Sequence, residues 1–322
     1  MSKPPYAVAH HFTAATGALL TNHPMIGEVR AIDLARRWEL PTDVDVIMAL
    51  HGGDDELASN APRPEGWPGR VKLVQLASAG LDGYPDWLFD AQVASAAGTS
   101  AVPISEFVLA AMLAHEKRIP AIYARDGQTT PDNEAMIANP LGSLDGKTLG
   151  LIGIGQIGGR IATLARAFNM RVVAQRRSSA AAPEGVEIVP LDTLLARADH
   201  LVIAAPLTSE TAGLLDAAAF AKTKRGVHLV NIARGGIVDT AALIAALESG
   251  QVGAASLDVT DPEPLPAGHP LWRAPNVRIT PHVAWSSAGT PGRIFKLFAD
   301  NVGRLAAGET PINLLPPRRV EP

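Results

Sequence analysis

The sequence contains no cysteine among its 322 residues. Disulfides, thiolate zinc sites and cysteine nucleophiles are therefore all excluded. The sequence also lacks an apolar run of about 18 residues, the length that predicts a membrane span, and a long apolar stretch near its N-terminus. The net charge of -4 gives no electrostatic basis for binding nucleic acid or an anionic membrane. We therefore expect a soluble, cytoplasmic protein.

Short apolar runs alternate with helical segments along most of the chain. An apolar content of 47% with 19% charged residues is typical of a globular protein, and 322 residues are enough for two domains. Strands that are apolar throughout and alternate with helices predict parallel sheets covered on both faces. The predicted strands are 6–8, 44–50, 71–77, 92–96, 149–153, 171–175, 200–204, 227–232, 253–257 and 277–280.

These strands fall into two groups. We predict an α/β fold of two doubly wound parallel-sheet domains, a Rossmann dinucleotide-binding domain over 102–286 and a smaller flavodoxin-like domain made of 1–101 and 287–322. The return to the first domain is inferred from the helical apolar pattern over 289–307, which follows the last strand. A long helix is expected to begin at Pro103.

A glycine-rich motif lies in residues 149–162, LGLIGIGQIGGRIA. An apolar strand ends in Gly153-x-Gly155-x-x-Gly158, and a helical apolar pattern follows. The first glycine permits a tight turn, the second lets the backbone approach a pyrophosphate, and the third lets helix and strand pack closely. The helix N-terminus then offers free N–H groups to phosphates. With a second strand ending at Gln175, the context predicts a dinucleotide site.

Polar residues directly follow three of the later strands, where ligands bind in such sheets. Arg234, Glu263 and His282 are the candidates for chemistry there. An arginine can hold a carboxylate by paired hydrogen bonds, and a histidine can give a proton to a carbonyl oxygen. A carboxylate beside the histidine favours the protonated imidazole. The set suits hydride transfer to a 2-oxo acid. No metal site is predicted, because His10-His11 has no further ligand at suitable spacing.

Four motifs together resemble the D-isomer-specific 2-hydroxyacid dehydrogenases, which include glyoxylate/hydroxypyruvate reductases, D-lactate dehydrogenases and phosphoglycerate dehydrogenases. The resemblance covers about residues 70–315. The motifs are the glycine fingerprint, VNIARGGIVDTAAL (230–243), SLDVTDPEPLPAGHPLW (256–272) and ITPHVAW (279–285).

The resemblance implies a role for each matching residue. Arg234 would bind the substrate, Glu263 would hold the histidine, and His282 would act as the acid/base. Backbone N–H groups of a loop in the smaller, substrate domain would hold the substrate carboxylate, and this loop contains Ser78, Ala79 and Gly80. The residues implied at the cofactor are Gly153, Gly155, Gln156, Ile157, Gly158, Pro206, Ile232 and Asp258, the last near the nicotinamide carboxamide. The family also implies a homodimer, formed through the nucleotide domain and the helix near 104–118.

The end of the second Rossmann strand indicates the choice of cofactor. An NAD site has an acidic residue there for the ribose 2′-hydroxyl. This chain instead has Arg176, Arg177 and Ser178, which suit a 2′-phosphate. We therefore predict a preference for NADP(H), with NAD(H) possible.

The expected function is NADPH-dependent reduction of a small 2-oxo acid, of the glyoxylate or hydroxypyruvate class, to the D-2-hydroxy acid. One alternative is a phosphoglycerate-type dehydrogenase or one for bulky 2-hydroxy acids. The phosphoglycerate reading is disfavoured because the chain ends soon after Leu305 and shows no obvious basic cluster in its first domain. An alternative of another class is a dinucleotide-sensing binding protein, like the corepressors that share this fold. The role of Trp285, between packing and ligand contact, stays open.

Overall fold

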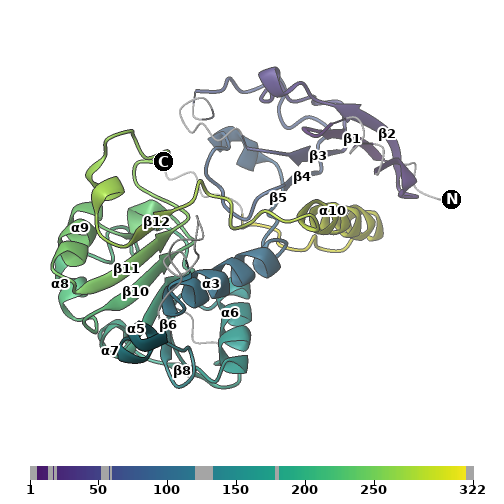
Figure 1. The fold of residues 1–322 in the computed structure, drawn as a ribbon. Helices are drawn as coiled ribbons and strands as arrows, with labels where there is room; N and C mark the ends of the chain where they lie inside the picture. The colour runs from purple at the N-terminus through teal and green to yellow at the C-terminus, as the bar shows by residue number, and fades with distance from the viewer. Residues whose placement is uncertain are drawn as a thin grey trace. The chain divides into compact units, whose positions relative to one another are not determined.

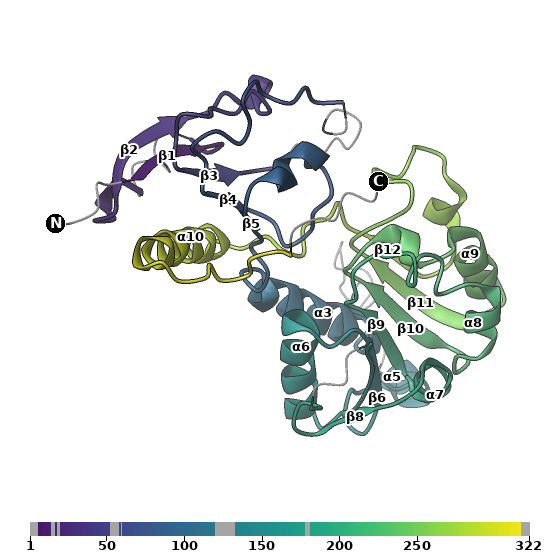
Figure 2. The same cartoon turned by 180° about the vertical axis from the view of Figure 1, so that it is seen from behind.

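A computed structural model of the chain describes residues 6–13, 17, 20–51, 58, 60–119, 133–177 and 181–316. The chain divides into two compact units, which Figures 1 and 2 show from opposite sides. The first unit comprises residues 1–99 and 288–322, and the second comprises residues 100–287. No helix in the described residues is both long enough and apolar enough to cross a bilayer.

The first unit is built on a parallel sheet with strand order β2-β1-β3-β4-β5, the order of flavodoxin-like folds. Its strands are β1 (Tyr6–His10), β2 (Ile26–Ala31), β3 (Val46–Ala49), β4 (Leu73–Leu76) and β5 (Val93–Ala94). In the described part of this unit the helices are α10 (Thr290–Ala307) and the 3-10 helices η1 (Leu20–Asn22), η2 (Leu34–Arg36) and η3 (Asp86–Asp90). The predicted flavodoxin-like fold is thus confirmed.

The last helix packs on this first sheet, as its apolar pattern predicts. Phe295, Phe298 and Val302 of α10 share a buried cluster with side chains of β1, β3 and β4. In the same interface the Asn301 amide donates to the Gln75 amide oxygen at 2.7 Å. Beyond the helix, the chain pairs with β5 in an antiparallel bridge. The C-terminal segment is therefore part of the first unit's fold.

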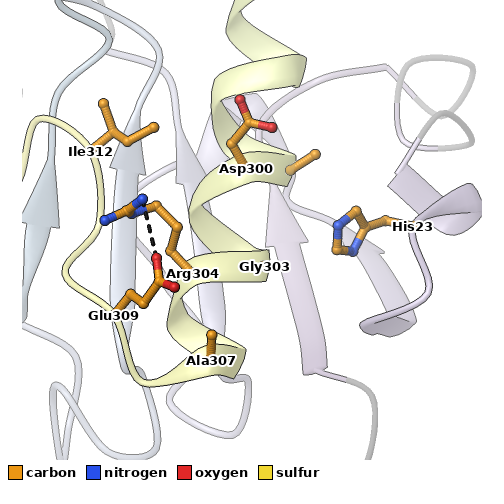
Figure 3. Close-up of a pocket in the computed structure, with 8 residues that line it drawn as sticks. His23, Asp300, Gly303, Arg304, Ala307, Glu309 and Ile312 are labelled. Carbon is orange, nitrogen blue, oxygen red and sulfur yellow. Dashed lines mark ion pairs between the residues drawn. The ribbon is translucent and has the colours of Figure 1, made fainter.

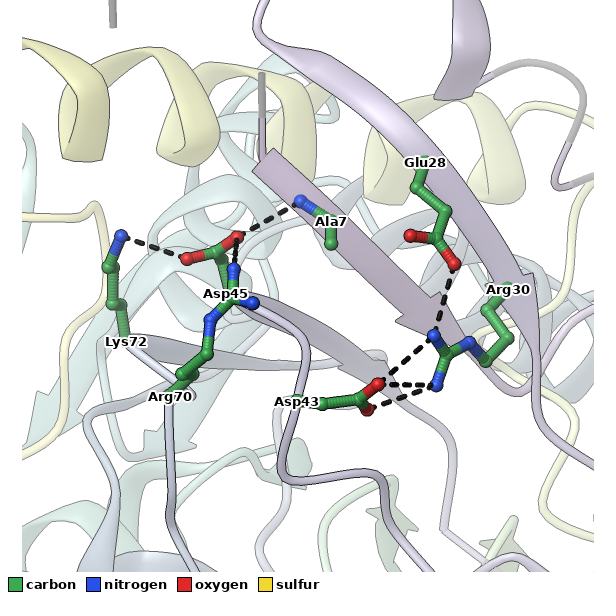
Figure 4. A network of polar contacts seen from close by, with 7 residues as sticks. All are labelled: Ala7, Glu28, Arg30, Asp43, Asp45, Arg70 and Lys72. Carbon is green, nitrogen blue, oxygen red and sulfur yellow. Dashed lines mark hydrogen bonds and ion pairs between the residues drawn. The ribbon is translucent and has the colours of Figure 1, made fainter. Parts of the chain in front are cut away.

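Strand β2 was not predicted from the sequence. It lies at the edge of the sheet and only Ile26 of its six residues is buried, so it carries no apolar run. Its Arg30 is paired instead with Asp43 and Glu28 on the surface, as Figure 4 shows.

A second ion-pair group surrounds Asp45, which leads into β3. The buried Asp45 carboxylate accepts from Lys72 Nζ at 2.9 Å, from Arg70 Nη2 at 3.2 Å and from the Ala7 N–H at 3.1 Å (Figure 4). Burial raises the pKa of Asp45, but these donors outweigh burial and hold the pKa below its ordinary value. The group links β1, β3 and β4 at their amino ends.

The second unit is a seven-stranded parallel sheet with strand order β12-β11-β10-β9-β6-β7-β8. Its strands are β6 (Thr148–Ile152), β7 (Arg171–Gln175), β8 (Val186–Ile188), β9 (His200–Ile203), β10 (Val227–Asn231), β11 (Val252–Leu257) and β12 (Val277–Ile279). Within its described residues the helices are α3 (Ala101–Glu116), α5 (Asn133–Ala138), α6 (Gln156–Ala167), α7 (Leu191–Arg197), α8 (Ala217–Ala221), α9 (Thr240–Glu248), η4 (Gly235–Ile237) and η5 (Pro270–Arg273). The order is that of a Rossmann domain, so this prediction is also confirmed.

Alternate residues of these strands face two separate cores. Val202 of β9 packs with α3 and α6, whereas its neighbours Leu201 and Ile203 pack with α7, α8 and α9. Because helices cover both faces of the sheet, successive residues of each strand are buried, and the strands are continuous apolar runs in the sequence. The three-residue strand β8 was missed because it has only one buried residue, Val186.

A chain of polar side chains, all buried except Lys147, links α3 to the amino ends of β9 and β10 and reaches Ser256 within β11. Lys147 Nζ lies 2.6 Å from Glu116 Oε1, which lies 3.1 Å from His200 Nε2. His200 Nδ1 is 3.1 Å from His228 Nδ1, and His228 Nε2 is 3.0 Å from Ser256 Oγ. The chain joins α3 to β9, β10 and β11.

Burial of this chain shifts its protonation equilibria. Desolvation lowers the pKa of His228 well below its ordinary value, and His115, stacked on it with ring centroids 4.3 Å apart, is shifted in the same direction. Burial raises the pKa of Glu116, but His200 and Lys147 outweigh burial and bring it to about 2.

We expect acid to destabilise this unit in a defined pH range. A histidine whose pKa is lowered by folding binds its proton more readily once unfolded, so its contribution to stability is complete above the unfolded pKa of about 6.5 and is lost below it. Between pH 7 and 5, the free energy of unfolding should fall by up to about 1.4 kcal/mol per pH unit for each such histidine. His228→Asn, measured by urea unfolding at several pH values, should flatten this dependence. An unchanged slope would contradict the assignment.

Candidate active site

One row of paired residues runs across six strands of the second unit and marks the carboxyl edge of its sheet. The row consists of Gln175, Ile152, Ile203, Asn231, Leu257 and Ile279, each opposite the next. The strands are parallel, so the residues that follow each member of this row by one to three positions lie at the same edge of the sheet. Gly153, Arg176, Pro206, Arg234, Asp258 and His282 all follow the row in this way.

At each of the three fingerprint glycines a side chain would either clash with the backbone or fill open space beside the turn. Gly153 has a φ of +92°, and a Cβ there would lie 2.7 Å from the Ala205 nitrogen. A Cβ at Gly158 would overlap the carbonyl oxygen of Gly153. A Cβ at Gly155 would meet nothing within 4 Å, so this glycine leaves open space instead. The backbone thus has a tight turn, a close strand–helix contact and an open approach between them.

Helix α6 begins in that open space. Gly155 is its N-cap and supplies no side-chain cap, so the first N–H groups of the helix, at Gln156 and Ile157, are not satisfied by a capping side chain. Unsatisfied N–H groups at a helix N-terminus favour an anion. The residues present therefore fit a dinucleotide pyrophosphate. Of the two other predicted contacts, Pro206 follows β9, and Ile232 is buried just after β10.

Two arginines follow β7, the second strand of the predicted nucleotide fold. Arg176 is half-buried, and its Nε is buried without a hydrogen-bond partner among the described residues. Arg177 is exposed and pairs with Glu210, its Nη1 lying 2.9 Å from Oε2. Ser178 lies outside the described residues. A buried, unsatisfied guanidinium nitrogen fits a site for an anionic group.

His282 and Glu263 are in direct contact. His282 Nδ1 lies 2.7 Å from Glu263 Oε1, and the Thr260 N–H donates to the other carboxylate oxygen at 3.3 Å. Both side chains are about two-fifths exposed, 40% for His282 and 39% for Glu263. The contact fixes the orientation of the imidazole through Nδ1, and the ring is partly exposed, so the pair could act as a general acid.

The buried carboxylate of Asp258 holds the segment that carries the histidine. Its Oδ1 accepts from Thr280 Oγ1 at 2.6 Å and from the Val283 N–H at 2.9 Å, and its Oδ2 accepts from the Ala284 N–H at 2.9 Å. Its backbone oxygen accepts from the His282 N–H at 2.9 Å. Sequence reasoning placed Asp258 at the nicotinamide and missed this support. The sequence shows an acidic residue directly after an apolar strand, but this pattern does not indicate which groups the carboxylate binds.

Arg234 lies at the end of β10, in a turn packed tightly on the next strand's loop. Its Nη1 donates to the Ala233 carbonyl at 2.7 Å. The buried Asn231 spans this turn, since its amide donates to the Arg234 carbonyl and accepts from the Ala233 N–H. A Cβ at Gly235 would overlap the Thr260 backbone. The turn of Arg234 and the loop of Glu263 are therefore one packed structure.

The predicted carboxylate loop of the first unit follows β4. Ser78 Oγ donates to the Gly80 carbonyl at 2.7 Å and lies 3.0 Å from the Tyr84 hydroxyl. Burial raises the pKa of Tyr84 to about 12, so the phenol stays neutral. The N–H groups of Ala79 and Gly80 make no hydrogen bond within the described chain. Such a loop fits a carboxylate ligand.

Two other features of the first unit lie apart from the predicted site residues. A surface pocket of about 470 Å³ is lined by His23, by small residues of α10 and by the Arg304–Glu309 ion pair (Figure 3). His10 and His11 are buried and engage the backbone through ring nitrogens. In the described part of the chain, no three histidine, aspartate or glutamate side chains are grouped as a metal site.

Comparison with known proteins identifies the family. Residues 109–284 match the D-isomer specific 2-hydroxyacid dehydrogenase NAD binding domain. The chain belongs to the D-isomer specific 2-hydroxyacid dehydrogenase family. This confirms the resemblance seen in the motifs, and the family is one of NAD(P)-dependent oxidoreductases.

Individual relatives carry more than one substrate name. The chain is 36% identical to D-3-phosphoglycerate dehydrogenase of Mycobacterium bovis over 96% of its own length and 58% of the relative's. It is 42% identical to glyoxylate reductase of Aeropyrum pernix over 53% of its length and 52% of the relative's. The chain thus spans little more than half the length of either relative.

A solved structure of a family member covers the whole fold. The D-isomer specific 2-hydroxyacid dehydrogenase from Xanthobacter autotrophicus Py2, in complex with NADPH and MES, is 30% identical. The match covers 98% of this chain and 99% of that one with a TM-score of 0.77.

We expect Gly235→Ala to destabilise the second unit, because the added methyl group overlaps the Thr260 backbone rather than a movable side chain. The loss should be about 2 kcal/mol or more, measured by thermal or urea unfolding. Gly159→Ala is the matched control, since a Cβ there meets nothing within 4 Å in helix α6, and it should be neutral or stabilising. Equal stability of the two variants would show that the turn is not packed as described.

Proposed function

We propose that the protein reduces a small 2-oxo acid to the D-2-hydroxy acid with a reduced nicotinamide cofactor, with His282 as proton donor and Arg234 as substrate binder. The observation that carries the proposal is the Glu263–His282 contact at the same sheet edge as the glycine turn. The bound cofactor would supply the hydride. Family membership supports the reaction class.

The protein's own residues account for the remaining steps. With Nδ1 donating to the Glu263 carboxylate, a protonated His282 can give its Nε2 proton to the carbonyl oxygen that becomes a hydroxyl. The Glu263 carboxylate balances the positive charge of the protonated ring before the transfer. Afterwards the neutral imidazole keeps its Nδ1–H on Glu263. Arg234 would orient the acid by its carboxylate or carbonyl oxygen. The free N–H groups of Ala79 and Gly80, beside Ser78, would receive the substrate carboxylate.

Several finer assignments belong to the same proposal. Residues 102–286 act as the dinucleotide-binding domain, and residues 1–101 with 287–322 as the substrate domain. The cofactor contacts are Gly153, Gly155, Gln156, Ile157, Gly158, Arg176, Arg177, Ser178, Pro206, Ile232 and Asp258. We also propose that the protein forms a homodimer in which α3 is part of the interface.

Two substrate classes are supported by names of relatives. The glyoxylate reductase relative favours glyoxylate. We propose glyoxylate and hydroxypyruvate, which belong to the same class of small 2-oxo acids, as substrates. The phosphoglycerate dehydrogenase relative favours 3-phosphoglycerate chemistry as the second candidate. Rates of NADPH and NADH oxidation with glyoxylate, hydroxypyruvate, phosphohydroxypyruvate and phenylpyruvate separate them. Tight NADPH binding with no turnover of any of these acids would instead favour a dinucleotide-sensing binding protein.

His282→Gln should abolish most turnover without loss of cofactor binding. General acid catalysis is worth about 10²- to 10⁴-fold, and glutamine cannot deliver the proton. We expect kcat to fall in that range, while NADPH affinity, measured by fluorescence titration, stays within about twofold. A variant that retains turnover would show that another group is the acid.

Arg176→Ala should weaken NADPH much more than NADH, because only NADPH carries the 2′-phosphate that we assign to this guanidinium. One charged hydrogen-bonded contact is worth about 1.5–3 kcal/mol, or about 10- to 100-fold in Kd. Arg171→Ala is the matched control, since Arg171 is exposed at the opposite end of the same strand. The NADPH-bound relative at 30% identity supports this cofactor. Equal losses for both cofactors would overturn the assignment.

A further inference from the structure

The backbone of His282 has an unusual conformation. Its φ is +52°, in the left-handed region that a residue with a Cβ rarely adopts. Such a conformation persists only where the surroundings hold it. Because the side chain leaves from the Cα of this residue, the backbone conformation sets the direction of the Cα–Cβ bond and so the region that the ring can reach.

The N–H side of this residue is held by the protein backbone. The His282 N–H donates to the Asp258 carbonyl at 2.9 Å and to the Thr280 carbonyl at 3.0 Å. The Asp258 carboxylate then fixes the following two peptide N–H groups. These contacts set the path of the chain into and out of the residue, but they do not involve the His282 carbonyl.

A side chain holds the carbonyl side. Trp285 Nε1 donates to the His282 carbonyl oxygen at 2.8 Å. The Ser286 N–H donates to the Val283 carbonyl at 2.8 Å and closes the turn between the two residues. The indole remains 48% exposed, so core burial does not account for its place here. Its polar N–H is bonded to the backbone of the histidine.

We propose that Trp285 is the positioning residue for His282. Its indole N–H fixes the peptide carbonyl of the left-handed residue, so that the imidazole keeps Nδ1 on Glu263 and presents Nε2 in one direction. The inference rests on the proposed function, in which His282 is the proton donor. It assigns Trp285 to orientation of the acid rather than to packing.

Trp285→Phe removes the donor and keeps an aromatic ring. We expect kcat for 2-oxo acid reduction to fall about 10- to 100-fold, the effect of misplacing a catalytic group, with the KM for the acid and the Kd for NADPH within about twofold of wild type. Thermal unfolding should be unchanged. Trp272→Phe is the matched control, because that indole is 52% exposed and also donates to a backbone carbonyl, that of Pro266 at 3.0 Å.

The histidine ring itself gives a readout that does not require turnover. In ¹⁵N spectra of the side-chain imidazoles, assigned by comparison with His282→Gln, the His282 signals should shift and broaden in Trp285→Phe and stay unchanged in Trp272→Phe. If wild type turns over no acid but this spectral change occurs, the proposed function fails and the positioning role stands.

Three results would overturn the inference. An unchanged kcat with unchanged His282 signals would show that the indole N–H does not orient the ring. A rise in KM alone would make Trp285 a substrate contact. A fall in unfolding temperature that accounts for the loss of activity, without a change in the His282 signals, would make it a packing residue.

Discussion

The site depends on one constraint, the in-register pairing of six parallel strands in the second unit. Because Ile279, Leu257 and Asn231 lie opposite one another, the residues that follow them reach the same edge of the sheet. Parallel strands all end in the same direction. Each polar residue that follows a strand therefore lies at this edge as a result of the strand pairing alone. Arg234, Asp258 and His282 lie 24 residues apart from one to the next along the chain and share an edge for this reason.

Further hydrogen bonds and packing contacts fix the positions of the side chains that share this edge. The Asp258 carboxylate ties together three groups of the segment 280–284, and Glu263 holds the imidazole at 2.7 Å. The close packing of Gly235 on Thr260 joins the arginine turn to the glutamate loop. Each of these residues is held by backbone that is itself held by the sheet. Rigid support of this kind is what a proton donor needs in order to act in one direction.

The two edges of the sheet carry different polar chemistry. At the carboxyl edge, the two side chains of the proposed acid pair are partly exposed, 40% for His282 and 39% for Glu263. At the amino edge, Glu116, His200 and His228 are buried and pair with one another. The histidines there lie within the strands and close the end of the core. A histidine's place relative to its strand therefore distinguishes the buried, paired histidines from His282, to which we assign the chemistry, and composition does not reveal this difference.

The sequence by itself determined the fold class, the glycine turn and the residue types at the strand ends. It could do so because buried parallel strands are apolar runs and because the glycine spacing has a local steric cause. It did not determine strands β2 and β8, which lie at sheet edges and bury too few residues to leave a pattern. Only the tertiary structure decided what Asp258 holds, that His282 is left-handed, and that the indole of Trp285 reaches back to its carbonyl. Each of these features depends on the direction and distance between particular atoms in the folded chain. The type of a residue does not determine where its polar atoms point.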